Sequence, residues 1–410
     1  MMERARLLLS LSWRNLWRNS RRTALILVAV GVGVWSMLSF TALLQAWTAS
    51  SLDAALMDMT GQGQIHATGY LDDPGVDHRM APPAGQLRDL LDAAEVARWA
   101  PRVRVPAAIQ SEYETWPVTL AGIDPARERG LSFIGDGVRK GEALAGPDAP
   151  GILLGRRLAD RLHTGIGKRV VVMSQDASGA LAERGYQVVG LFAAAPNAED
   201  HEVFVGLATA QTMLGMSNDI SEVAFDLHDM AGLPQYIERL RQAAPGADVQ
   251  PWQKLRPMTE ALNTVFDAFV EVWIAVMFIL MAFGIVNTLL MSLHERVREL
   301  ALLQALGLRP RLIFAQVTLE SLLVMLLGVV AGSITGAATI LAFHGGLDLG
   351  FLARGAEWLG AGRVLYPHLA ISQFVAIGLA VWILGVVAGL LPTWRMVRRV
   401  PIEAISRSPT

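Results

Sequence analysis

The sequence predicts a membrane protein with four transmembrane helices and a large α+β domain outside the membrane, inserted between the first and second helices. Three observations support this fold class. Only 18% of the 410 residues are charged, fewer than in an ordinary soluble enzyme. Four runs stay apolar over the roughly 20 residues that a helix needs to cross a bilayer. Residues 47–265, between the first two runs, interleave strand-like and helix-like patterns.

The first 22 residues are basic and amphipathic. Leu9, Trp13, Leu16 and Trp17 fall near one face of a helix, and arginines surround them. A helix of this kind lies in the cytoplasmic interface of a membrane, although the same arginines also suit a simple anchor for the span that follows. We therefore expect residues 1–22 to form a cytoplasmic amphipathic helix.

The arginines around the four spans set their orientation. They gather before the first span, between the second and third, and after the fourth, whereas the third connection holds only Arg354 and Arg363. By the positive-inside rule both termini are then cytoplasmic. The expected order is a span at 23–46, a periplasmic domain at 47–265, a span at 266–293, a cytoplasmic loop at 294–311, a span at 312–343, a periplasmic loop at 344–369, a span at 370–394 and a cytoplasmic tail at 395–410.

The outer domain is expected to be α+β, and its pattern allows two lobes. The tetrapeptide DASG at 176–179 joins two strand-like pieces and predicts a hairpin. Strands are expected at 64–70, 118–123, 169–174, 186–192, 202–207 and 222–227, and helices at 84–94, 155–162, 207–215 and 233–243. From Leu255 to Phe269 the pattern is helical, which predicts one continuous helix running from the domain into the second span, with an ordinary linker as the alternative.

Several classes of function lack their motifs in these 410 residues. There is no cysteine, which excludes disulfides and thiolate metal sites, and a net charge of -2 without a nucleic-acid motif argues against nucleic acid as a partner. No phosphate-binding loop or hydrolase motif occurs, so no catalytic residue, cofactor or metal ligand is expected. The acidic stretch at 72–78 is interpreted as a solvated loop, with binding of a divalent cation through its carboxylate oxygens as the alternative. The stretch NAEDHE, with Asn197, Glu199 and Asp200, is interpreted as an exposed loop, with contact to a periplasmic partner as the alternative.

Few ionisable residues fall inside the predicted spans. Asp267, Glu271 and Glu320 lie near span ends, where exposure at the interface is the expected explanation. Gly328, Gly332 and Gly336 recur at four-residue spacing, which favours close packing against another helix, either of this chain or of a second permease.

The cytoplasmic loop HERVRELALLQALGLRPR at 294–311 is helical by pattern. Gly307 suits the end of a helix and Pro310 suits the first turn of the next. A loop that only reverses direction would not need such a helix. The helix predicted here either presents a rigid surface to a cytoplasmic partner or is exposed to solvent and carries arginines that the positive-inside rule places on the cytoplasmic side.

This loop resembles the E-R-x-R-E-[IL]-G-x-L-R-A-x-G signature of ABC-transporter permeases of the MacB, LolC/LolE and FtsX-like family. The match covers Glu295, Arg296, Arg298, Glu299, Leu300, Leu303, Ala305, Leu306 and Gly307, while Ala301 and Gln304 depart from the usual Gly and Arg. The chain end resembles the closing motif of the family at Arg395, Arg399, Pro401 and Glu403. Together with GIDPARE at 122–128 and GILLGRRLADRL at 151–162, the resemblance is closest to the lipoprotein-release branch.

The resemblance implies a function that the residue pattern alone does not. The helix around residues 295–307, Gln304 included, would be the coupling helix that docks on a cytoplasmic ABC ATPase dimer, with ATP and Mg bound by that partner. A second permease, identical or related, would complete the assembly in the bacterial inner membrane. The implied task is extraction of lipoproteins or other membrane-derived cargo for a periplasmic carrier. Efflux of drugs or peptides with a membrane-fusion protein, and FtsX-like regulation of a cell-wall hydrolase, are the alternatives.

Overall fold

The computed structural model describes residues 10, 12–14, 16–18, 20–295, 310–350 and 364–399. The chain divides into two compact units. The first, the helical unit, comprises residues 1–50, 262–356 and 362–410. The second, the sheet unit, comprises residues 51–261 and 357–361. Each unit is described by itself.

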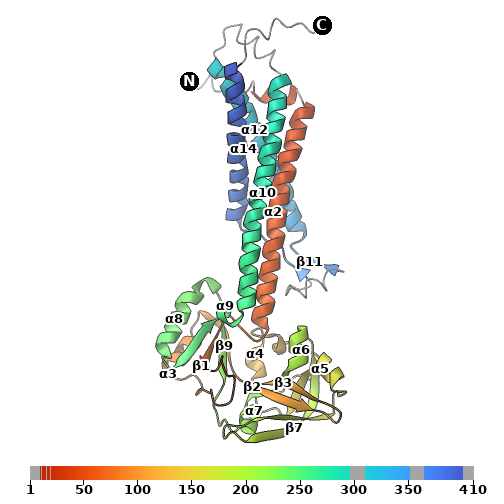
Figure 1. The fold of residues 1–410 in the computed structure, drawn as a ribbon, viewed down its shortest axis with the longest axis vertical. Helices are drawn as coiled ribbons and strands as arrows, with labels where there is room; N and C mark the ends of the chain where they lie inside the picture. The colour runs from red at the N-terminus through yellow and green to blue at the C-terminus, as the bar shows by residue number, and fades with distance from the viewer. Residues whose placement is uncertain are drawn as a thin grey trace. The chain divides into compact units, whose positions relative to one another are not determined.

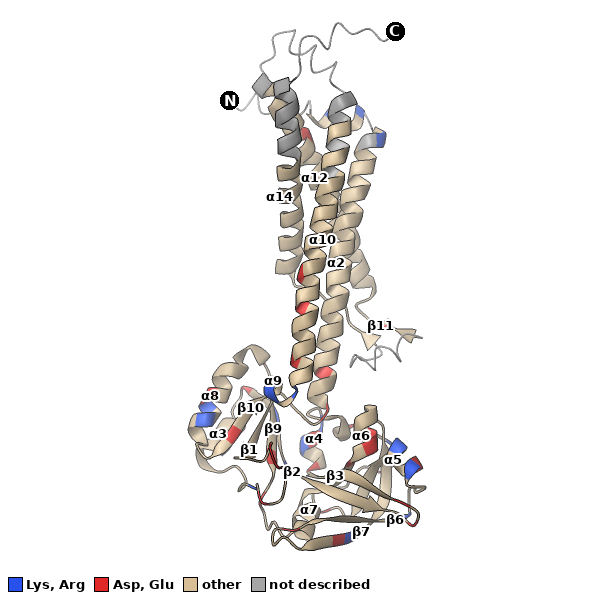
Figure 2. Ribbon diagram, in the orientation of Figure 1, with Lys and Arg blue, Asp and Glu red and all other residues tan. Residues whose placement is uncertain are grey.

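In the described part of the chain, four helices are long and apolar enough to cross a membrane, as predicted (Figure 1). They are α2 (Ser20–Met57), α10 (Pro257–Glu295), α12 (Pro310–Ala342) and α14 (Ile371–Arg399). Their apolar stretches are Thr23–Met57, Pro257–Gly284, Phe314–Ala342 and Ile371–Ala388. Figure 2 shows long parts of α12 and α14 without charged residues. Two short strands, β11 (Leu347–Asp348) and β12 (Val364–Leu365), pair with each other between α12 and α14.

The glycine stripe of α12 packs against α2 of the same chain. A Cβ atom added at Gly332 would lie 2.5 Å from the Gly31 carbonyl oxygen, and one at Gly328 would lie 2.8 Å from the Val30 side chain. A Cβ at Gly336 would meet Leu38 at 3.0 Å. Small residues let the two backbones approach closely, so the packing predicted from this spacing occurs within the chain.

The acidic residues of the spans differ in exposure. Asp267 and Glu271 on α10 are exposed. Glu320 on α12 is only 7% exposed, beside buried apolar side chains of the same helix. The expectation of interfacial exposure is therefore wrong for Glu320, because α12 turns this side chain into the helical unit.

The sheet unit holds ten strands and seven α-helices (Figure 1). The sheet order is β10-β1-β9-β2-β3-β8-β5-β7-β4, and β6 pairs with β2 and β7. The strands are β1 (Gly63–Ala67), β2 (Val96–Gln110), β3 (Thr115–Ile123), β4 (Val138–Gly141), β5 (Gly151–Gly155), β6 (Arg169–Gln175), β7 (Leu181–Phe192), β8 (Glu202–Gly206), β9 (Glu222–Leu227) and β10 (Ala247–Pro251). The helices are α3 (Gly85–Leu91), α4 (Pro125–Glu128), α5 (Arg156–Arg161), α6 (Pro196–His201), α7 (Leu207–Leu214), α8 (Leu233–Ala243) and α9 (Trp252–Leu255).

Strand β2 divides the sheet unit into two lobes. Residues 96–102 of β2 pair with β9, and residues 103–110 pair with β3. Lobe 1 contains β1, β9 and β10 with α3 and α8, around a core that includes Ile65, Phe225 and Tyr236. Lobe 2 contains β3 to β8 with α4 to α7, and its cores include Leu120 and Phe204. The α+β pattern with two lobes is thus present in the structure.

Candidate functional site

A buried arginine lies where β2 passes from lobe 1 to lobe 2. The Arg102 side chain has no exposed surface. Its Nε and Nη2 atoms donate to the two carboxylate oxygens of Glu128 at 2.7 and 2.9 Å. Its Nη1 atom donates to the Met59 carbonyl at 2.6 Å and to Glu222 Oε1 at 3.2 Å. A bidentate pair of this kind holds a guanidinium in a fixed orientation.

The three partners of Arg102 come from three different parts of the sheet unit. Glu128 ends α4 in lobe 2, and Glu222 begins β9 in lobe 1, directly opposite Arg102 in the strand register. Met59 lies two residues after the end of α2 and has a left-handed backbone, with φ of 60°. Its carbonyl also accepts a hydrogen bond from Gln64 Nε2 at 2.9 Å. We call Arg102, Glu128, Glu222 and Met59 the junction cluster, because it joins the end of α2 to both lobes.

The electrostatics of the junction cluster favour ionised side chains. Burial acts to raise the pKa of Glu222, but His66, Arg104 and Arg102 outweigh burial and lower it to about 2. His66 Nε2 lies 3.8 Å from Glu222 Oε2, too far for a hydrogen bond, and 3.0 Å from Gln64 Oε1. Removing one partner from such a buried pair leaves an uncompensated charge and costs about 3–5 kcal/mol.

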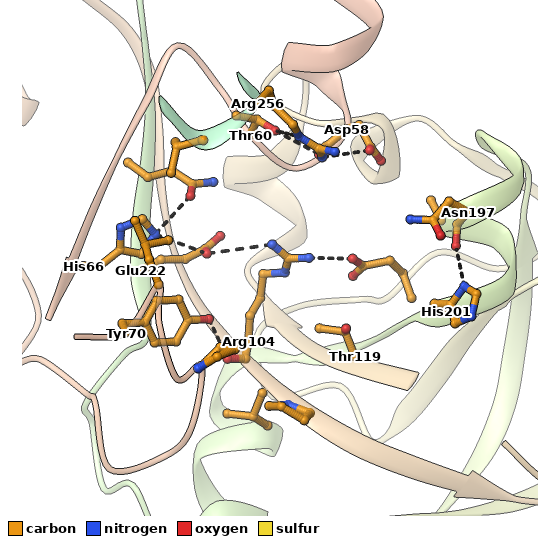
Figure 3. Close-up of a pocket in the computed structure, with 18 residues that line it drawn as sticks. Asp58, Thr60, His66, Tyr70, Arg104, Thr119, Asn197, His201, Glu222 and Arg256 are labelled. Carbon is orange, nitrogen blue, oxygen red and sulfur yellow. Dashed lines mark hydrogen bonds and ion pairs between the residues drawn. The ribbon is translucent and has the colours of Figure 1, made fainter. Parts of the chain in front are cut away.

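A polar pocket of about 430 Å³ lies beside the junction cluster (Figure 3). Arg104 projects into it and pairs with Glu202 at 2.5 Å, while its second Nη atom lies 3.9 Å from Glu222. Burial, with Glu222 nearby, raises the pKa of Tyr70, whose hydroxyl donates to the Arg104 carbonyl at 2.7 Å. Every arginine that lines the pocket is paired with a carboxylate, so the pocket offers no free cationic site among the described residues.

Arg256 joins the end of α2 to the start of α10 at the rim of this pocket (Figure 3). Its Nη2 atom donates to the carbonyl and carboxylate oxygens of Asp58 at 2.6 and 2.8 Å, and its Nε atom donates to Thr60 at 2.8 Å. Asp58 directly follows α2, and Pro257 is the first residue of α10. The predicted continuous helix into the second span is present, but it begins at Pro257 and not at Leu255, because α9 ends at Leu255 and Arg256 has a φ of -127°. From Pro257 onward α10 is continuous, as expected for proline in a first helical turn.

The stretch NAEDHE is not an exposed loop, because residues 197–201 belong to α6 and Glu202 begins β8. Glu199 and Asp200 in α6 are 3% and 8% exposed. Arginines of α5 neutralise them, with contacts from Arg156 to Glu199 at 3.4 Å and from Arg157 to Asp200 at 3.1 Å. The hydrogen bond from Arg157 holds the pKa of Asp200 below its usual range. The predicted exposure is therefore wrong for both carboxylates, whereas Asn197 is exposed and lines the pocket.

The predicted coupling helix lies almost wholly outside the described residues. Glu295 is the last residue of α10, and the predicted partner-docking positions from 296 to 307 follow it. In the tail motif Arg395 and Arg399 belong to α14, and Pro401 and Glu403 lie outside the described residues. Among the described residues, no group of three or more His, Cys, Asp or Glu could hold a metal ion.

Sequence reasoning did not identify the junction cluster. Its one signal was the stretch APRVRVP, in which Arg102 and Arg104 alternate with apolar residues at strand spacing. A charged side chain on one face of an otherwise apolar strand is buried on folding, and it then needs an oppositely charged or hydrogen-bonding partner. The partners could not be named, because residues 59, 128 and 222 are distant from Arg102 in the chain.

Comparisons with known proteins match both parts of the chain. The family model described as the MacB-like periplasmic core domain matches residues 23–243, more than half of the chain. The FtsX-like permease C-terminal model matches residues 272–401. The lipoprotein-releasing system transmembrane protein LolC of Neisseria meningitidis is 24% identical over 333 residues, which are 77% of this chain and 77% of that protein.

A second group of relatives is longer. The macrolide export ATP-binding/permease protein MacB of Nitrobacter winogradskyi is 25% identical over 276 residues. The match takes in 63% of this chain but only 38% of that protein. The solved periplasmic region of MacB from Actinobacillus actinomycetemcomitans aligns with 49% of this chain and 94% of that region, at 11% identity and a TM-score of 0.35.

Proposed function

Because the chain belongs to the family of ABC-transporter permeases with a MacB-like periplasmic core domain and an FtsX-like C-terminal region, we propose that it transmits motion from a cytoplasmic ATPase to its sheet unit. The ATPase dimer would bind ATP and Mg, and a second permease, identical or related, would complete the assembly. Both termini would be cytoplasmic and the sheet unit periplasmic, in agreement with the distribution of arginines around the spans.

Contacts inside the sheet unit supply a route for this motion. The ends of α2 and α10 are linked by Arg256, so a shift of either helix end acts on Asp58 and Thr60. Met59 is the next residue after Asp58, and its carbonyl is held by Arg102. Arg102 in turn holds Glu128 of lobe 2 and Glu222 of lobe 1. A displacement at the end of α2 would therefore reach both lobes through one side chain.

The ATPase contact in this proposal is the coupling helix. It would consist of Glu295, Arg296, Arg298, Glu299, Leu300, Leu303, Gln304, Ala305, Leu306 and Gly307. The helix α10 runs unbroken over 39 residues and ends at Glu295, the first residue of this set. A continuous helix is stiff enough to move as one body, so movement of the coupling helix would be passed along α10.

The proposed cargo is a lipid-anchored protein, which the transporter would extract from the inner membrane and deliver to a periplasmic carrier. The observation that carries this choice is the match to the LolC relative, which extends over 77% of each chain. Export of a small molecule with a membrane-fusion partner is the second candidate, favoured by the match to the macrolide-export relative.

A pull-down of the full chain in mild detergent, with mass spectrometry of retained proteins and lipids, tests the proposal. An ATPase recovered together with a lipid-modified protein is the expected result. An ATPase with a membrane-fusion protein and no lipoprotein would move the function to export. Recovery of no ATPase, under conditions that keep a known ABC transporter whole, would contradict the permease function itself.

A further inference from the structure

Two tryptophans and neighbouring arginines are exposed just before the first apolar span. Trp13 is 46% exposed and Trp17 is 54% exposed. Their rings meet edge to face, with centroids 6.0 Å apart. Arg14, the next residue after Trp13, and Arg21, four residues after Trp17 in the chain, are exposed as well. We call Trp13, Arg14, Trp17 and Arg21 the tryptophan–arginine surface.

The opposite face of the same segment is buried in the helical unit. Ser12 is fully buried, and Leu16, 2% exposed, belongs to one apolar cluster with Ile26 and Val30 of α2. The Thr23 hydroxyl donates to the Leu16 carbonyl at 2.7 Å. In a straight helix, residues seven apart are separated by roughly 10 Å of rise, so the chain turns between these two residues. The segment is therefore held against the start of α2.

This attachment fixes the depth of the exposed residues relative to the span. Thr23 is the first residue of the apolar stretch of α2. The tryptophan–arginine surface therefore lies at the level where the hydrocarbon core of a bilayer would meet its headgroup region. Tryptophan concentrates at this level of membranes, with its ring among the headgroups. Arginine near the same level attracts anionic lipid, and its planar guanidinium binds phosphate oxygens in pairs.

We infer that the tryptophan–arginine surface binds the headgroup of an anionic phospholipid. Arg14 and Arg21 contact the phosphate and the additional negative charge, while the rings of Trp13 and Trp17 lie at the glycerol level. A phospholipid fits this surface because cationic groups bind its phosphate and aromatic rings lie among its headgroups, and both kinds of side chain are found where the span begins. The inference does not depend on the cargo or the ATPase of the proposed function.

Native mass spectrometry of the full chain in detergent tests the inference, with phosphatidylglycerol and phosphatidylcholine added as equal competitors. We expect the protein to retain phosphatidylglycerol in preference. The double variant Arg14→Gln/Arg21→Gln should bind phosphatidylglycerol about thirtyfold more weakly and bind phosphatidylcholine unchanged. The double variant Arg14→Lys/Arg21→Lys should keep most of the preference, because it keeps the charge.

The control variant Arg139→Gln/Arg169→Gln removes two exposed arginines from β4 and β6 and should leave the preference intact. A second readout is fluorescence quenching by phosphatidylglycerol brominated on its acyl chains. Because the chain has 11 tryptophans, the signal of interest is the loss of quenching in Trp13→Phe/Trp17→Phe. Equal retention of both lipids, or the same loss in the control variant, would overturn the inference. Quenching that disappears when an ATPase binds would assign the surface to protein docking instead.

Discussion

Replacing Arg102 with methionine should destabilise the sheet unit strongly. Methionine fills much of the same volume, but the carboxylates of Glu128 and Glu222 would remain buried without the guanidinium, and the Met59 carbonyl would lose a donor. Breaking a buried ion pair in this way costs about 3–5 kcal/mol. The loss is lower than a sum over all the broken contacts, because contacts in one network are not additive.

Hydrogen exchange of the full chain, followed peptide by peptide, measures this effect. A loss of about 3–5 kcal/mol corresponds to roughly two to four orders of magnitude in the opening equilibrium of β2 and β9. The matched control is Arg98→Met, four residues earlier on the same strand, where the exposed side chain donates to the Gly130 carbonyl at 3.4 Å. That control should change stability by about 0.5 kcal/mol or less.

The outcome of a triple variant separates charge from packing. In Arg102→Met/Glu128→Gln/Glu222→Gln no unpaired charge is buried, so most of the lost protection should return. Equal effects of Arg98→Met and Arg102→Met would refute the account of the junction cluster. So would a triple variant that is no more stable than Arg102→Met.

Four further predictions concern other contacts. The pKa of Glu222 is about 2 in the folded protein and 4.5 ordinarily, so its ionised carboxylate stabilises the fold above pH 4.5. As pH falls from 4.5 toward 2, the free energy of unfolding should decrease by roughly 3 kcal/mol in a series of denaturation measurements. Gly332→Ala should destabilise the helical unit by about 1–3 kcal/mol, since its Cβ would lie 2.5 Å from the Gly31 carbonyl, while Gly284→Ala on α10 meets nothing within 4 Å and should be neutral or stabilising in thermal unfolding. Arg256→Gln and Asp58→Asn should each loosen the 56–62 segment in hydrogen exchange, and the double variant should add little, because both remove the same ion pair. Glu295→Lys/Arg298→Glu should uncouple ATP hydrolysis from transport, whereas reversing the exposed pair Glu238 and Arg241 on α8 should not.

Much of the fold could be predicted from local sequence. Hydropathy alone located α2, α10, α12 and α14, because a span needs a long apolar run whatever its tertiary contacts. The hairpin between β6 and β7 followed from Asp176, whose carboxylate accepts from the backbone of Ser178 and Ala180. The extension of α2 beyond residue 46 to Met57 was not predicted, because residues 23–46 already supply the length that a bilayer span needs.

Features that depend on distant partners could not be predicted. Strand β2 contains Pro101 and Pro106, and proline is unfavourable within strands. Pairing with β3, β6 and β9 stabilises the strand. The burial of Glu199 and Asp200 depends on arginines of α5 about forty residues earlier. The junction cluster likewise forms only because the fold brings Met59, Glu128 and Glu222 next to Arg102.

The central claim is that α10 passes motion from the ATPase to the sheet unit as one rigid helix. A flexible Gly-Ser segment inserted after Leu262 tests it most directly, in the full chain reconstituted in vesicles with the ATPase recovered by the pull-down. The control insertion goes into the exposed turn at Ser178 and Gly179. The account predicts that ATPase binding survives both insertions and that release of cargo stops only with the insertion at Leu262. Normal release with that insertion would contradict it.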